Sequence, residues 1–278
     1  MKKHTQSFNT RQDMSRAGFE IFHYQDPEIQ EIALHHHDFF EVYLFLGGKV
    51  DYFVEGRTYR LIPGDVLLIN PMELHRPLVE PGTPYERIVL WIDKALLSSL
   101  SDGTDDLSDC FRASESRFHA AHTDLGSKLT LLAQEFAGKE YGSSVFCQGL
   151  LLQVIVELNR LVLRGEGAGA GAEIDPLILQ VLEYIRAHYC EPLSLDGLAE
   201  RFYVSKYHLS HLFSHTVGVS VYRYILLKRL QIARELLSEG TPPGAVCQSC
   251  GFQDYANFYR AFRRQYGETP QSVLRRRY

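Results

Sequence analysis

The chain has 278 residues, 45% of them hydrophobic, and is therefore long enough for two globular domains with separate cores. No apolar run approaches the ~20 residues of a membrane helix, no signal-peptide-like stretch follows Met1, and the five scattered cysteines are typical of reduced thiols, so we expect a cytoplasmic chain. The formal net charge of −5 is uneven: residues 1–174 carry 16 Lys+Arg and 25 Asp+Glu, whereas residues 175–278 carry 13 and 9, as expected when only the second part contacts phosphate.

The N-terminal part has the pattern of short strands. After a polar start, with one strand expected at 19–23, hydrophobic residues follow the strand period in five segments separated by turn signals such as Gly47-Gly48 and Pro63-Gly64-Asp65. Strands of this length and spacing suggest a small antiparallel β-barrel or jelly roll. The five segments are 32–45, 50–54, 58–61, 66–69 and 87–92.

A histidine-rich motif lies in the first of these segments. His35, His37 and Glu41 share parity, so an extended strand would place all three side chains on one face and His36 on the other. Together with His75, this motif resembles the cupin signature, in which H-x-H, a Glu four residues later and a distant His converge inside a barrel. The resemblance implies a cupin-like domain with a site formed by His35, His37, Glu41 and His75.

The chemistry of these four residues allows three interpretations. Three imidazoles and a carboxylate would suit a divalent transition metal, namely Fe, Mn, Ni or Zn. The same groups, joined by Tyr43, would suit the wall of a pocket for a small-molecule effector, such as a sugar or another metabolite. In the third interpretation the histidines are structural, and hydrogen bonds satisfy their ring nitrogens. Apart from the first interpretation, the sequence indicates no cofactor.

Three helices are expected after the strands, at 94–100, 124–139 and 145–163. The last is apolar on more than one face, so it must bury one face against the strands and another elsewhere. A two-fold homodimer contact through an outward stripe that includes Leu151 and Leu158 is one interpretation, and a purely intramolecular site is the other.

A Gly/Ala run, from Gly165 to Ala172, is typical of a flexible linker. We therefore predict an N-terminal domain at 1–164, a linker at 165–174 and a C-terminal domain at 175–278. The predicted fold class is α+β, with a sheet domain that carries a helical dimerisation segment, followed by an all-α domain.

The C-terminal domain contains two helix-turn-helix patterns, at 194–214 and 243–266. In the first, Ser194 caps one helix and Ser205 caps the next, which is free to enter a major groove. In the second, Gly251 makes the turn and Asp254 caps the second helix. The amphipathic segment 220–238 between them predicts one helix of about 28 Å. Such a helix could hold two DNA-contacting helices roughly one DNA turn, about 34 Å, apart.

Cys247 and Cys250 form a C-x-x-C pair in the second pattern. No second Cys/His pair lies nearby at zinc-finger spacing, and positions i and i+3 share the inner face of a short helix. We interpret the pair as packing residues.

The C-terminal domain resembles the AraC family of bacterial transcription regulators. The match comprises Leu198-Ala199, Ser205–Phe213, Gly218, Tyr224, Arg229, Ala233, Leu236-Leu237, Cys250-Gly251-Phe252, Phe258, Phe262 and Gly267-Glu268-Thr269-Pro270, with Cys247 where the family usually has Ala. The resemblance implies a sequence-specific regulator of transcription, usually an activator that contacts RNA polymerase, with an N-terminal domain that senses an effector. Residues expected to contact double-stranded DNA are Lys206, Tyr207, Ser210, His211, Tyr255, Ala256, Asn257, Arg260 and Arg264.

A rival hypothesis is a metal-dependent cupin enzyme with a DNA-binding appendage. No separate acid, base or cofactor motif accompanies the histidine cluster, so we predict that the chain is not an enzyme. A purely architectural DNA binder would leave the barrel without a role.

Overall fold

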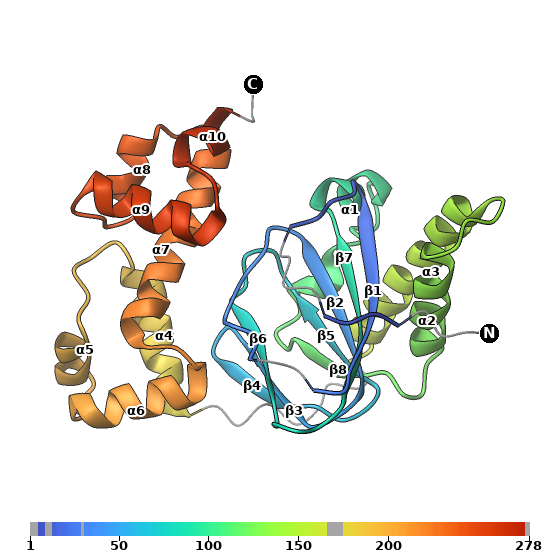
Figure 1. Cartoon of the computed structure of the whole chain (residues 1–278), viewed down its shortest axis with the longest axis horizontal. Coiled ribbons are helices and arrows are strands. Elements are labelled where there is room, and N and C mark those ends of the chain that lie inside the picture. Colours follow the sequence, from blue (N-terminus) through green and yellow to red (C-terminus); the bar gives the residue numbers. More distant parts are fainter. Residues whose placement is uncertain (1–4, 9–12, 29–30, 166–174, 276–278) are drawn as a thin grey trace. The chain divides into compact units, whose positions relative to one another are not determined.

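The computed structural model describes residues 5–8, 13–28, 31–165 and 175–275, and the chain divides into two compact units, residues 1–173 and 174–278. The strands formed by the described residues all belong to the first unit, whereas the second unit consists of helices (Figure 1). Apart from Gly165, the linker predicted at 165–174 lies outside the described residues.

The N-terminal unit is built on two antiparallel sheets. Its strands are β1 (Phe19–Asp26), β2 (Phe40–Gly47), β3 (Val50–Val54), β4 (Arg57–Arg60), β5 (Asp65–Ile69), β6 (His75–Val79), β7 (Tyr85–Ile92) and β8 (Arg117–His119). Five strands pair in the order β1-β7-β2-β5-β8, and three pair in the order β4-β3-β6. In the first sheet Glu41 of β2 lies opposite Trp91 of β7, and Tyr24 of β1 lies opposite Arg87.

Helices cover one face of the five-stranded sheet, and the three-stranded sheet covers the other. Figure 1 shows α2 (Leu125–Phe136) and α3 (Ser143–Leu163) side by side on the helical face. Because successive strand residues point to opposite faces, Val42 and Leu44 of β2 pack with the helices, while Tyr43 and Phe45 pack between the sheets. Two short helices, α1 (Lys94–Leu100) and η1 (Asp109–Arg112), complete the unit.

The predicted strand at 32–45 is wrong in its first half. Strand β2 begins only at Phe40, opposite Ile92, and His35 joins the fold through an isolated bridge to His75. Strands β6 and β8 were not predicted. Strand β6 contains Pro77, which has no N–H to donate, and such strands occur at sheet edges, where β6 indeed lies.

Helix α3 is a core helix of the N-terminal unit. Leu151 and Leu158 are 1% and 0% exposed and pack in the cluster shared with α2 and the sheet. The outward stripe predicted through these two residues is therefore wrong, because the face that carries them is turned inward, to the core shared with α2 and the sheet. By length and composition α3 could also cross a membrane, a test that buried core helices of soluble proteins pass as well.

The C-terminal unit consists of helices that surround one long helix. They are α4 (Pro176–His188), α5 (Leu195–Arg201), α6 (Lys206–Val217), α7 (Val221–Ser238), α8 (Pro243–Ser249), α9 (Tyr255–Tyr266) and α10 (Pro270–Arg275). The helices α5 and α6 lie at one end of α7, and α8 and α9 at the other (Figure 1). With 18 residues, α7 is about 27 Å long. Helix α10 was not predicted.

Candidate functional sites

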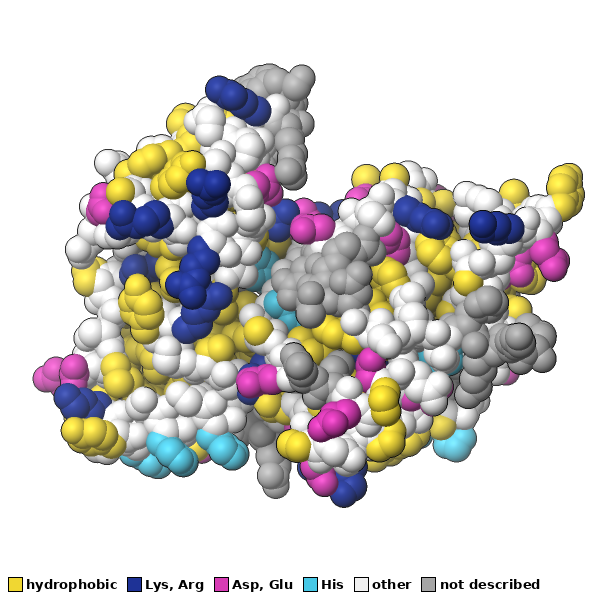
Figure 2. Space-filling view, viewed as in Figure 1, with side chains coloured by type: hydrophobic (Ala, Val, Ile, Leu, Met, Phe, Trp, Pro, Cys, Tyr) yellow, Lys and Arg dark blue, Asp and Glu magenta, His cyan; other side chains and the backbone are white. Residues whose placement is uncertain are grey.

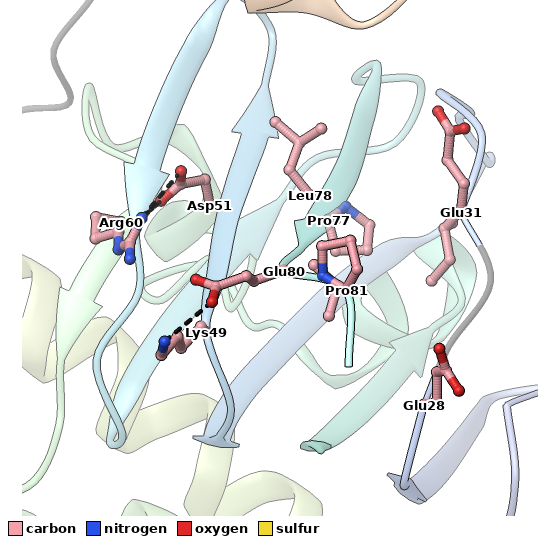
Figure 3. Close-up of a pocket in the computed structure, with 11 residues that line it drawn as sticks. Glu28, Glu31, Lys49, Asp51, Arg60, Pro77, Leu78, Glu80 and Pro81 are labelled. Atoms are coloured by element: carbon pink, nitrogen blue, oxygen red, sulfur yellow. Dashed lines mark hydrogen bonds and ion pairs between the residues drawn. The ribbon is translucent and has the colours of Figure 1, made fainter. Parts of the chain in front are cut away.

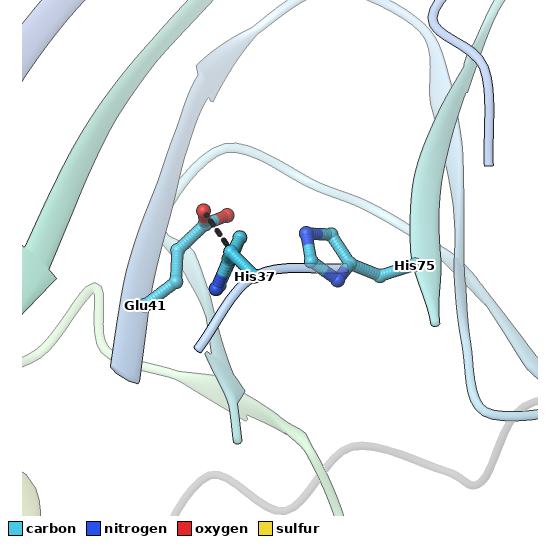
Figure 4. Close-up of side chains that lie close together, drawn as sticks. All are labelled: His37, Glu41 and His75. Carbon is cyan, nitrogen blue, oxygen red and sulfur yellow. Dashed lines mark hydrogen bonds and ion pairs between the residues drawn. The ribbon is translucent and has the colours of Figure 1, made fainter. Parts of the chain in front are cut away.

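The histidine cluster lies between the two sheets of the N-terminal unit. His37, Glu41 and His75 each offer a ligand atom, and these atoms lie within 4.8 Å of one another. Glu41 comes from β2 and His75 from β6, so strands of different sheets bring the groups together around His37 (Figure 4). All three residues are buried.

Backbone hydrogen bonds fix the tautomers of three histidines. The Nδ1 atoms of His35, His37 and His75 lie 2.8, 3.0 and 2.8 Å from backbone carbonyl oxygens two residues away in each case. A carbonyl oxygen can only accept, so each Nδ1 carries the hydrogen and donates it. In the uncharged rings of His35 and His75, the Nε2 atom is therefore left as an acceptor.

His37 contacts the carboxylate of Glu41. The Nε2 atom of His37 lies 3.1 Å from Oε2 of Glu41, which also accepts a hydrogen bond of 2.8 Å from the Trp91 indole. Within the described residues, Nε2 of His75 is buried without a hydrogen-bond partner. Burial lowers the pKa of His35 to about 4 and that of His75 well below its ordinary value. The uncharged ring of His75 thus presents a lone pair within 4.8 Å of the nearest ligand atoms of His37 and Glu41, an arrangement that a cation would stabilise.

The cluster opens into a cavity of about 40 Å³ between the sheets. This volume holds about three water molecules or an ion, which is far smaller than the several hundred Å³ of a pocket for a metabolite. Residues that line it include Phe8, Tyr24, His35, His37, Glu41, Tyr43, Tyr52, Tyr85, Arg87 and Trp91.

A larger hollow of about 480 Å³ lies on the surface of the same unit. Figure 3 shows its two cations in ion pairs, Lys49 with Glu80 and Arg60 with Asp51, while the carboxylates of Glu28 and Glu31 also line the hollow. Because both cations are already paired, this hollow is a weaker candidate for an anionic ligand than the buried cavity.

The structure brings the predicted cavity residues together, although not as the sequence suggested. His35 and His37 precede β2 rather than lying in it, and a bend after His37 stacks its ring on Phe39 at 3.9 Å. His35 is only half buried, with its ring 4.3 Å from that of His75. Sequence reasoning missed Arg87 and Trp91. Both lie at alternate positions of a predicted strand, and this parity was the available signal.

The first helix-turn-helix unit presents α6 to solvent. As predicted, Ser205 caps this helix by accepting a hydrogen bond of 3.2 Å from the N–H of His208, and Ser194 caps α5 in the same way. Lys206, Tyr207 and His211 are exposed, whereas Ser210 is half buried.

The second helix-turn-helix unit presents α9, and all five predicted contact residues on it are exposed: Tyr255, Ala256, Asn257, Arg260 and Arg264. Asp254 caps α9 as predicted, with its two carboxylate oxygens each 3.1 Å from a backbone N–H of the first turn. Arg260 donates a hydrogen bond of 2.5 Å to Asn257, so these two exposed side chains pair with each other on the outer face of α9.

Side chains on the surface follow the charge asymmetry of the sequence. On the face shown in Figure 2, Lys and Arg gather over the C-terminal helices. Cys247 and Cys250 are buried, and Sγ of Cys247 contacts the carbonyl of Phe252 at 3.7 Å, in agreement with packing. Among the described residues, they are not part of any group of three potential metal ligands.

Comparison with known proteins identifies both units. Residues 18–153 match the AraC-like ligand binding domain family, and residues 198–276 match a helix-turn-helix domain family. The probable transcriptional regulator LumQ of Photobacterium leiognathi is 27% identical over 239 residues, covering 85% of this chain and 89% of that protein. The HTH-type transcriptional activator RhaS of Escherichia fergusonii is 25% identical over 255 residues, covering 89% and 90%.

A solved structure of similar sequence is the DNA-binding domain of AdpA, the global transcriptional factor, in complex with a target DNA. It is 26% identical, with a TM-score of 0.35, over 37% of this chain and 92% of that chain. The two family matches together span the sheet unit and the helical unit, and the relatives are regulators rather than enzymes. The chain therefore belongs to the AraC family of transcription regulators and is a sequence-specific DNA-binding regulator of transcription.

Proposed function

We propose that the chain is an effector-responsive activator whose effector binds in the cavity between the two sheets. The observation that carries this proposal is the convergence of buried, incompletely satisfied polar groups, above all Nε2 of His75 beside Glu41. A buried acceptor without a partner costs about 1–3 kcal/mol, so an occupant that supplies hydrogen bonds or charge would be favoured. The name of RhaS, an activator, supports activation as the response.

An effector acts if it binds one arrangement of the protein better than another. A sugar, or another metabolite as large as a sugar, is larger than the cavity volume of about 40 Å³, so its binding requires side chains of the cavity to move. This movement is the step through which occupancy would reach the DNA-binding unit.

A reporter assay tests the proposal. The double substitution His37→Ala with His75→Ala should abolish the response to the effector while the purified protein still binds operator DNA. His122→Ala is the matched control, because this histidine is exposed on the same unit. A normal response of the double variant would place the effector site elsewhere.

We also propose that His37, Glu41 and His75 hold a divalent transition metal, with His35 beside them. The fixed tautomers support this, because metal-binding histidines usually donate their other ring N–H to a carbonyl or carboxylate. When bound, the ion would supply positive charge and an open coordination position for an oxygen of the effector.

Metal analysis of protein purified without chelator, then with added Zn²⁺, tests this site. One equivalent should be retained by the wild type and by His122→Gln, and lost from His75→Gln. If the wild type retains no metal under either condition, the histidines belong to the effector pocket alone.

For the helical unit, we propose that α6 and α9 enter successive major grooves of double-stranded DNA. The exposure of their outer residues and the cap-defined starts of both helices support this. The contacts would come from Lys206, Tyr207, Ser210, His211, Tyr255, Ala256, Asn257, Arg260 and Arg264.

We also propose that α3 forms a dimer contact, but through a different face from the one that the sequence suggested. Val145 and Phe146 are 72% and 51% exposed, and Leu152 of the same helix is 37% exposed. Phe146→Glu should lower the dimer fraction in sedimentation experiments without unfolding the domain, whereas Leu158→Glu should unfold it. A wild type that stays monomeric at micromolar concentration, with and without DNA, would contradict the dimer.

Three further features remain proposals. The two facing antiparallel sheets support a cupin-like jelly roll, and the match to a helix-turn-helix domain family, whose target is DNA, supports a cytoplasmic location. Contact with RNA polymerase would follow from activation.

A further inference from the structure

A buried arginine lines the same cavity, four residues before Trp91 on β7. Arg87 on β7 is 2% exposed, and its Nη1 atom pairs with the Asp26 carboxylate and lies 3.4 Å from the carbonyl oxygen of Tyr85. Its Nη2 atom is buried and, within the described residues, has no hydrogen-bond partner. A guanidinium carries its donors in a fixed fork, and leaving part of a charged group unpaired in the interior is costly.

Aromatic rings hold this guanidinium in place. Its central carbon lies 4.1 Å from the ring centre of Tyr85, 4.7 Å from that of Tyr24 and 5.2 Å from that of Phe8. Arg87 itself lines the cavity, as do all three rings. The side chain is therefore both fixed and adjacent to the space that an occupant would fill.

A second donor lies beside it. The hydroxyls of Tyr43 and Tyr85 are 2.5 Å apart and, in the described part of the chain, hydrogen-bond only to each other. Each hydroxyl has one hydrogen and only one is used between them, so the pair keeps one O–H to donate. The cavity wall around Arg87 thus offers the N–H groups of Nη2 and one tyrosine hydroxyl, and both donors need an acceptor.

We infer that the effector carries a carboxylate, which binds Nη2 of Arg87 and the free hydroxyl of the Tyr43–Tyr85 pair. This inference rests on the proposed function, because it assigns the chemical class of the effector of that cavity. A monoanion fits better than a phosphate dianion, since Asp26 already neutralises part of the guanidinium charge and the Nη1 atom of Arg87 is already paired.

The part of the effector beyond its carboxylate could then lie toward the histidine cluster. Residues 87, 89 and 91 of β7 all line the cavity, and Trp91 donates to Glu41. The four steps along β7 from Arg87 to Trp91 span about 13 Å. An acid with a polar group at its far end could therefore reach from Arg87 to the histidine cluster.

Thermal denaturation of the full-length protein tests the inference with defined probes. Acetate, glycolate, pyruvate and benzoate would each be compared with the corresponding amide at equal ionic strength. At least one acid should raise the melting temperature of the wild type more than its amide does. Arg87→Gln should weaken the binding of that acid about ten- to hundredfold, the effect expected for loss of a charge-assisted hydrogen bond.

Lys49→Gln is the matched control, because Lys49 is an exposed cation of the same unit that pairs with Glu80. This variant should bind the acid as the wild type does. If no acid is distinguished from its amide, or if Arg87→Gln binds the acid unchanged, the inference is overturned.

A measurement on the wild type covers the case in which Arg87→Gln does not fold. Nitrogen-15 NMR of the arginine side chains should show that the acid shifts the Nη resonance of one protected arginine, whereas the amide does not. An unchanged spectrum at saturating acid would also overturn the inference.

The two proposals fail in different ways. An acid that binds at Arg87 but leaves operator binding and reporter output unchanged would contradict the effector role of the cavity and leave the carboxylate site standing. A reporter response that is lost in the His37→Ala/His75→Ala variant but intact in Arg87→Gln would support the effector role of the cavity and contradict the carboxylate site.

Discussion

The two helix-turn-helix units use the same turn with different residues. In the first, the N–H of Val204 donates to the carbonyl of Ala199, and in the second the N–H of Phe252 donates to that of Cys247, both at 3.0 Å. The residue before each donor is left-handed: Tyr203 has φ 55° and Gly251 has φ 74°.

The surroundings explain why one turn tolerates tyrosine. The side chain of Tyr203 is 96% exposed, so the only energetic cost at this position is the backbone strain of the left-handed region. A Cβ on Gly251 would instead lie 2.4 Å from the carbonyl oxygen of Cys190. The left-handed turn is thus common to both units, whereas glycine is required only where another backbone packs against it.

The largest expected effect separates these two positions. Gly251→Ala should destabilise the C-terminal unit by about 3 kcal/mol, because it combines left-handed strain with a collision against rigid backbone. Tyr203→Ala should change the stability by less than about 0.5 kcal/mol. Denaturant unfolding measures both variants. Equal losses would mean that the contact with Cys190 is not what demands glycine.

The contrast between exposed and packed side chains extends to the tyrosines. Burial raises the pKa of Tyr85 to about 12, and burial also raises the pKa of Tyr43 and Tyr52 well above 10. Above pH 10 the unfolded state therefore loses protons that the folded state retains, so stability falls as pH rises. The slope should reach about 1.4 kcal/mol per pH unit for each buried tyrosine.

Tyrosinate absorbance, followed together with circular dichroism, checks this prediction. A group of the 16 tyrosines should ionise only as the N-terminal unit unfolds. Tyr203→Phe should leave the alkaline transition unchanged, and Tyr85→Phe should make it less steep. Complete ionisation before any unfolding would contradict the assignment.

The recognition helices should differ in how they read DNA. Helix α9 offers Arg260, whose fork can bond a guanine edge, so Arg260→Ala should cost about 1–3 kcal/mol of specific binding and relax the preference at one base position. His211→Ala on α6 should act in the other half-site. Electrophoretic titration on operator and random DNA measures both. Equal losses on the two DNAs would assign these residues to phosphate contact.

The smallest effect concerns the caps of the same helices. Asp254 accepts two backbone hydrogen bonds and adds a negative charge at the start of α9, while Ser205 accepts one at the start of α6. Asp254→Ala should therefore cost about 1–2 kcal/mol, and Ser205→Ala about 0.5–1 kcal/mol. Thermal unfolding in low and high salt compares them, since only the charged cap depends on salt. A larger loss for the serine would reverse this ranking.

The sequence alone determined the local elements of the helical unit. The cap residues Ser194, Ser205 and Asp254 and the spacing of apolar residues identify the starts and inner faces of these helices, because both signals act within a few residues of the chain. The same locality made the family recognisable. Strand positions were also readable where turns of Gly and Pro bound them, as at β3 and β5.

Only the tertiary structure decided the content of the cavity and the role of α3. The parity rule assumed that His35, His37 and Glu41 shared a strand, but the chain bends before β2, and convergence comes from pairing with β6, which contains Pro77. Asp26 pairs with Nη1 of Arg87 and leaves Nη2 without a hydrogen-bond partner among the described residues, yet it lies 61 residues away in the sequence. Such long-range partners leave no periodic signal, and for the same reason the pattern of α3 could not tell which apolar face meets the sheet.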